Sequence, residues 1–198
     1  MKKFGLLVGA TVLLCVACGQ QAAQAAKEIT LAQYTEKANA LTAEVYSSAV
    51  ATMSATYNGQ SASVSLNYTY SEATGWVANA TTEQEKSAAQ SIDKIIGQQA
   101  KELAAAAAMT PATLGYTFRF FDDLSATVNY TSTSNEEGVT ETVELNDRYE
   151  FNATGTLVKT TEKMTITISG IPEEDIVPGV YENGTDTIDS TVSFVYSK

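Results

Sequence analysis

The residues best suited to chemistry in this chain are its only two cysteines, Cys15 and Cys18, which lie three positions apart. A CxxC redox pair works at the first turn of a helix in a βαβ unit, where the helix N-terminus lowers a thiol pKa. Here both cysteines lie in or beside an apolar stretch. A zinc site needs further Cys or His ligands, and the chain has no histidine and no third cysteine. Redox and zinc chemistry are therefore both disfavoured.

The first residues are typical of a secretory signal peptide. Lys2 and Lys3 form a positive segment, and an apolar run from Phe4 to Ala17 follows it. That run is shorter than the stretch of about 20 apolar residues that a helix needs to cross a bilayer. No later segment approaches this length, so we expect no transmembrane helix in the body.

The surroundings of Cys18 suggest a different use for its thiol. Ala17 precedes it and Gly19 follows it. At the end of a short apolar run, this pattern resembles the bacterial lipobox, although Cys15 stands where the lipobox usually has Leu. The resemblance implies that the chain is an envelope lipoprotein whose Cys18 carries the lipid. The alternative is an ordinary signal cleaved after a small-x-small pattern at residues 23–25.

These features divide the chain into three predicted parts. Residues 1–17 form a lipoprotein signal peptide, and the small and polar residues 18–28 form a tether. Residues 29–198 form one domain. A lipid on Cys18 would anchor the protein to a bacterial membrane of the cell envelope, on its periplasmic or surface side.

Composition excludes several classes of function. The net charge is −11 and there are only two arginines, which argues against a nucleic-acid partner. The absence of histidine excludes the usual nucleophile–His–acid hydrolases. Acidic pairs such as Asp122–Asp123 and Glu136–Glu137 lie at predicted turns, and none has EF-hand spacing. We therefore predict no catalytic residue, no metal site and no cofactor, and a hydrolase ranks last among the functions considered.

Two helices are expected. Thr30 to Gln33 has the form of a capping box, and apolar residues at three- and four-residue steps continue to about Ala51. A second capping box starts at Thr82, and a long alanine-rich helix is predicted from there to Pro111.

The remaining sequence is typical of β-strands. Apolar residues alternate with Ser and Thr in residues 61–70 and 76–78 and through most of the chain after Gly115. Turn signals separate the runs, among them Asn135 to Gly138 and Asn146–Asp147. Strands joined by short loops form antiparallel meanders. The sequence therefore predicts an α+β fold, in which an antiparallel β-meander forms a barrel or half-barrel with two helices packed on it, and Ser and Thr line a wet face.

Aromatic residues on these strands can be read in two ways. Most such residues pack in a core. The alternative is a cavity for a small apolar ligand, lined by Phe118, Phe120, Tyr130, Tyr149, Phe151 and Phe194. A resemblance supports the cavity. Gly75–Trp76 near the start of the meander, and the later run Tyr116 to Asp123, are similar to lipocalin-like lipoproteins of gut Bacteroidetes, although the usual motif is Gly-x-Trp. The resemblance implies a lipocalin-like domain able to hold an apolar molecule.

Two functions from different classes follow. The first is a non-enzymatic envelope lipoprotein that binds a small apolar ligand or an envelope partner. The second is a structural or assembly protein that uses a sheet edge or a helix face against another envelope protein.

Overall fold

A single antiparallel sheet forms the body of the protein. The computed structural model describes residues 26–177 and 182–198. Within them, nine strands pair in the order β1-β5-β6-β7-β8-β9-β2-β3-β4. The strands are β1 (Glu28–Ile29), β2 (Ser48–Tyr57), β3 (Gln60–Ser71), β4 (Gly75–Ala78), β5 (Tyr116–Phe121), β6 (Ala126–Glu136), β7 (Val139–Phe151), β8 (Leu157–Ser169) and β9 (Gly184–Ser197). The predicted α+β class with an antiparallel meander is confirmed, and the sheet stays open, with β1 and β4 at its edges.

The two faces of the sheet differ as the alternation predicts. In β2, Ala49, Ala51 and Met53 lie on one face, while Thr52 and Ser54 lie on the other and meet hydroxyls of β3. The first face carries the helices and the buried core, which includes Leu66, Val128 and Phe194 from distant strands. The second face is polar along the long strands: Ser and Thr are frequent on most of them, and β7 carries Glu144, Asn146 and Arg148 there.

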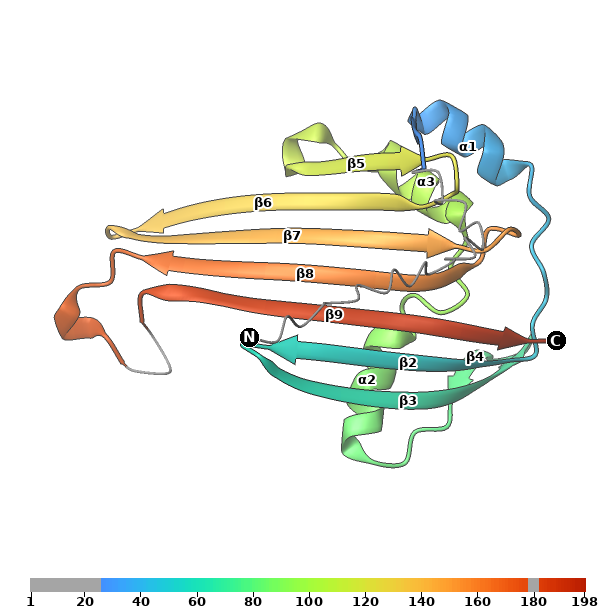
Figure 1. Ribbon diagram of the computed structural model, residues 1–198, viewed down its shortest axis with the longest axis horizontal. Coiled ribbons are helices and arrows are strands. Elements are labelled where there is room, and N and C mark those ends of the chain that lie inside the picture. The colour runs from blue at the N-terminus through green and yellow to red at the C-terminus, as the bar shows by residue number, and fades with distance from the viewer. Residues whose placement is uncertain (1–25, 178–181) are drawn as a thin grey trace, which may run out of the picture.

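The described residues contain three α-helices on the inner face, where two were expected: α1 (Leu31–Asn39), α2 (Glu83–Ile92) and α3 (Ala100–Met109). Figure 1 shows α1 and α3 together near β5 and α2 near β3, while β6 to β9 extend well beyond all three. Short 3-10 turns occupy Ala112–Leu114 and Glu173–Asp175. In α1, the buried ring of Tyr34 lies 4.5 Å from Phe120, and its hydroxyl donates to the Leu124 carbonyl.

The first expected helix is correct at its start and wrong at its end. The capping box of Thr30 and Gln33 is present, but α1 stops at Asn39 and Ser48–Tyr57 forms β2. Val45 and Ala49 continue the four-residue steps of a helix, but Ala49, Ala51 and Met53 alternate at every second position as in a strand, and pairing with β3 and β9 favours the strand. Asn58 and Gly59, with φ of 45° and 83°, then make the tight turn of the β2–β3 hairpin.

The second expected helix is divided in two. Its capping box at Thr82 is present, but the helix ends at Ile92 and α3 begins at Ala100. Gly97, between them, has a φ of +75°, and a Cβ there would lie 2.5 Å from the indole nitrogen of Trp76. Residue 97 must therefore be glycine, because the indole of Trp76 leaves no room for a Cβ. A continuous helix also could not pass through this residue, since its φ is positive.

Candidate functional site

A groove runs between α2 and the sheet because small side chains face each other across it. The capping box of Thr82 and Glu85 fixes the start of α2. The helix turns its buried side chains, Ala88, Ala89 and Ile92, toward the sheet. The facing part of the sheet carries small side chains such as Ala55 and Ala62, and a hollow of about 290 Å³ is left open. Its lining consists of Met53, Ala55, Ala62, Ser63, Val64, Gln84, Ser87, Ala88 and Ser91. Most of this part is apolar or bears only a small hydroxyl.

The groove continues across the sheet toward β7 and β8. A second hollow of about 210 Å³ shares Met53 and Ser91 with the first. Its further lining consists of Ile95, Asp147, Tyr149, Thr160, Thr161, Glu162, Ser190 and Val192. The two hollows together fall within the size range of small-molecule sites, about 300–1,000 Å³.

Two carboxylates lie side by side at this second end. Asp147 on β7 is the cross-strand partner of Glu162 on β8. The Tyr149 hydroxyl donates a long hydrogen bond of 3.4 Å to Oδ2 of Asp147. The other oxygen, Oδ1, is buried and has no hydrogen-bond partner among the described residues. Burial raises the pKa of Asp147 to about 6; the charge of Glu162 adds to the rise and the Tyr149 hydrogen bond opposes it.

This arrangement can bind a positive charge. Glycoside hydrolases place two carboxyl groups on either side of the scissile bond. Asp147 and Glu162 instead project from neighbouring strands of one sheet, so a molecule in the groove would meet both from the same side. The rest of the lining is mostly apolar or small. A pair of carboxylates at one end of such a groove can hold a positive charge.

The six aromatic residues predicted to line a cavity all lie on the inner face but do not form one site. Phe120, Phe151 and Phe194 are buried in the core. Phe118 packs against that core and, with Phe120, borders a separate hollow beside β1. Tyr130 stacks on Tyr116 at 4.7 Å. Only Tyr149 of the six is among the residues that line the groove under α2.

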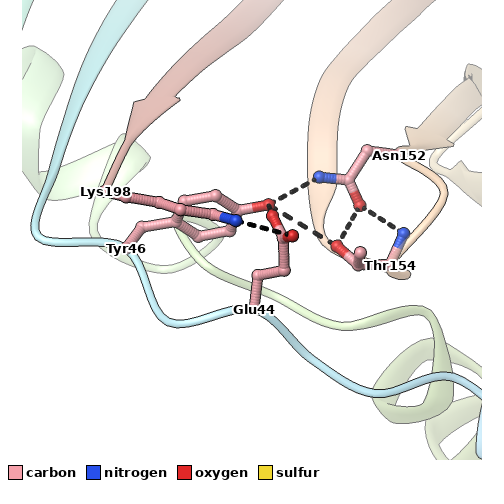
Figure 2. A network of polar contacts seen from close by, with 5 residues as sticks. All are labelled: Glu44, Tyr46, Asn152, Thr154 and Lys198. Carbon is pink, nitrogen blue, oxygen red and sulfur yellow. Dashed lines mark hydrogen bonds and ion pairs between the residues drawn. The ribbon is translucent and has the colours of Figure 1, made fainter.

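A polar network fixes the end of the sheet near the C-terminus. Figure 2 shows Tyr46 between Glu44 and the β7–β8 turn. The Asn152 side-chain amide donates to the Tyr46 hydroxyl at 3.1 Å, and that hydroxyl donates to Glu44 at 2.8 Å. Lys198 pairs with the same carboxylate at 2.9 Å. The side-chain Oδ1 of Asn152 accepts hydrogen bonds from the backbone N–H and the hydroxyl of Thr154. The network joins the segment before β2, the β7–β8 turn and the end of β9.

Aromatic stacking extends this network toward α2. The Tyr46 ring lies 4.8 Å from Tyr196, which in turn lies 5.7 Å from Trp76. The Tyr196 hydroxyl accepts a hydrogen bond from the backbone N–H of Gly97. The connection between α2 and α3 is thereby held on the sheet, which sets how closely α2 approaches it.

Other predicted features lie elsewhere. Cys18 falls outside the described residues, so its lipidation stays a prediction.

A hollow of about 1030 Å³ between the β6–β7 and β8–β9 ends is lined largely by exposed side chains such as Glu136, Glu137 and Asp175. In the described parts of the chain, no group of three or more His, Cys, Asp or Glu is placed to hold a metal ion. No helix in residues 26–177 and 182–198 is long and apolar enough to span a membrane.

Comparison with known proteins adds no relative: no family model, curated protein or solved structure matches the chain. The likeness to lipoproteins and to lipocalin-like proteins therefore stays an expectation from short motifs. Gly75–Trp76 lies in β4, where the indole packs on Tyr70 and Tyr196.

Sequence reasoning missed both carboxylates of the groove. The pair Asn146–Asp147 was expected to form a turn, but β7 runs unbroken from Val139 to Phe151. A signal was present: Leu145, Asp147 and Tyr149 alternate in step, which places the acid on the same face as its apolar neighbours. Glu162 likewise alternates in step with Met164 and Ile166 on β8.

Proposed function

We propose that this protein is a non-enzymatic binding protein of the cell envelope, which holds a small apolar ligand in the groove between α2 and the sheet. The observation that carries the proposal is the groove itself, whose apolar part is walled by Met53, Ala55 and Val64 on the sheet and by Ala88 on the helix. Unfilled apolar space between a helix and a sheet loses packing contacts, and a ligand restores them.

The proposal is tested with a neutral apolar dye, N-phenyl-1-naphthylamine, whose emission rises on binding. Ser91 and Gln90 are both exposed positions on α2, but only Ser91 lines the groove. Ser91→Phe should therefore close the groove and weaken dye binding by about tenfold or more, since one large side chain removes much of the contact area. Gln90→Phe should bind the dye as the wild type does.

Either of two results would contradict the proposal. One is the absence of dye binding by the wild-type protein. The other is equal binding by the wild type and Ser91→Phe, which would place the dye elsewhere on the molecule.

The second part of the proposal is that the protein is anchored to a bacterial membrane through a lipid on Cys18. It is supported by the short apolar run and the small residues Ala17 and Gly19 that flank the thiol. Cells given a radioactive fatty acid should label the wild-type chain and not Cys18→Ser. Cys15→Ser, which removes the other thiol, should still be labelled, and equal labelling of wild type and Cys18→Ser would rule out the anchor.

One observation favours the alternative of an assembly protein. β4 pairs only with Tyr68 to Ser71 of β3, so Gln60 to Asn67 have no further strand on their outer side in the described structure. This edge carries no Lys, Arg or Pro, the residues that commonly protect a sheet edge. Assembly through it predicts a concentration-dependent increase in mass by light scattering that Ser65→Lys abolishes. A mass that stays monomeric at all concentrations would exclude self-assembly.

A further inference from the structure

We infer that the ligand of the groove is a cationic amphiphile, with an apolar tail under α2 and an amine or similar positively charged head against Asp147 and Glu162. This inference rests on the proposed binding function and adds the chemical class of the ligand. It follows from the unlike linings of two adjoining hollows that share Met53 and Ser91.

The head-group end is negative and lacks a protein cation. Asp147 and Glu162 face the same hollow from neighbouring strands, and no Lys or Arg is among the residues that line it. Like charges directly opposite one another on a sheet repel. Lys163 comes next in β8 but, because successive side chains alternate, it points to the opposite face of the sheet. A bound cation would therefore supply the positive charge that no residue lining this hollow provides.

The geometry of Asp147 points the same way. Its Oδ1 is buried without a hydrogen-bond partner among the described residues, while Oδ2 has only the long bond from Tyr149. A buried carboxylate oxygen without a donor is costly, and a charged donor restores most of the loss. An ammonium group has three N–H donors, enough to bind the carboxylates of Asp147 and Glu162 together.

The tail end has the opposite character. Met53 and Ser91 mark the junction of the two hollows, and beyond them Ala55, Ala62 and Val64 offer methyl groups with no charge. A neutral or anionic amphiphile could use this end but would leave the carboxylates unpaired. An inorganic cation could neutralise the carboxylates but would leave the apolar part empty.

The test compares ligands that share a tail or a head. Decylamine, decanol and decanoate have tails of matched length with positive, neutral and negative heads, and ethylamine has the head with almost no tail. Binding of each to the full-length protein is measured by titration calorimetry at pH 7.5, below the concentration at which the ligands form micelles. Decylamine should bind about tenfold or more tighter than decanol, as a charge-assisted hydrogen bond to a carboxylate predicts, and decanoate should bind weakest.

Two variants at the head-group end, Asp147→Asn and Glu162→Gln, and one control, Asp189→Asn, locate the head group. Asp147→Asn should remove most of the tenfold preference for decylamine while leaving decanol binding within about twofold. Asp189→Asn removes one negative charge from the opposite, exposed face of β9 and should keep the full preference. Circular dichroism checks that both variants are folded, and Glu162→Gln provides a second change at the head-group end.

The results separate the inference from the function it rests on. If decanol and decylamine bind the wild type equally, or if Asp147→Asn and Glu162→Gln both keep the preference, the charged head is wrong although a binding groove exists. If ethylamine binds as tightly as decylamine, the site is a simple cation site and the amphiphile is wrong. If neither decanol nor the neutral dye binds, the proposed function itself fails.

Discussion

Replacing Asp147 by Asn should make the protein more stable at neutral and alkaline pH, an effect opposite to that of most substitutions at a half-buried position. An Asp in an unfolded chain has a pKa of about 3.9, whereas burial and the charge of Glu162 raise the pKa of Asp147 to about 6. Between these values the folded protein holds a proton that the unfolded chain has released. The stability contributed by this group is therefore present at pH 4 and is lost as the pH rises through 6.

The magnitude follows from the difference between the two pKa values, which corresponds to at most about 3 kcal/mol. Asp147 is only partly buried, so solvent screens the interaction and about 1 kcal/mol is a realistic gain for the Asn variant at pH 8. The side chain keeps its shape, and its new amide N–H₂ can donate to Glu162. For a chain of this size, about 1 kcal/mol raises Tm by about 2–4 °C.

Urea unfolding of both proteins at pH 4, 6 and 8 measures the effect. The advantage of the variant should be largest at pH 8, smaller at pH 6 and almost absent at pH 4. Asp189→Asn, on the exposed face, should stay within about 0.5 kcal/mol of the wild type at each pH. A variant less stable than the wild type at pH 8, or an advantage that does not change with pH, would refute this account of the buried carboxylate.

Two further predictions concern the positioning of α2. Gly97→Ala should destabilise the fold by about 2 kcal/mol or more in urea unfolding, because a Cβ there meets Trp76 at 2.5 Å and φ is +75°. Gly75→Ala is the control: its φ is +69° but the space around it is open, so it should lose only about 1 kcal/mol. Equal losses for the two variants would show that the indole of Trp76 does not contribute. Tyr46→Phe should cost about 1–2 kcal/mol of unfolding free energy, because it removes the hydroxyl that joins Glu44 and Asn152; an unchanged urea midpoint would show that the network adds nothing to stability.

Much of the fold could be predicted from local pattern. Alternation of apolar residues with Ser and Thr identified β3 and most strands after Gly115, and both capping boxes were correct. The helix ends could not be predicted in this way. Ala49 continues the helical steps from Val45 and also alternates with Ala51 as in a strand, and pairing with β3 and β9 decides between them. Gly97, in the break between α2 and α3, lies against the indole of Trp76, a contact that helical spacing does not reveal.

The candidate site was harder to predict because it lies where large side chains are missing from the space between α2 and the sheet. Phe118, Phe120, Phe151 and Phe194 were expected near a ligand on account of their size, but large rings fill space and pack against α1 or the core. The groove lies instead where side chains are small, as at Ala55 and Ser91. Asp147 was assigned to a turn because Asn–Asp pairs are common there, although its register with Glu162 places it in the sheet.

The position of β9 in the strand order has a consequence for how the chain is made. β9 pairs with β8 on one side and with β2 on the other, so Ser48 meets Ser197 across a very long stretch of sequence. On a ribosome, the β2–β3 hairpin emerges early and must wait with an unpaired edge until residues beyond 184 have been synthesised. Such distant pairing slows folding. A nascent chain would therefore complete its sheet only after nearly the whole sequence has been synthesised. A nonsense mutation near residue 184 would divide the sheet into two pieces, since it removes an interior strand and not an edge.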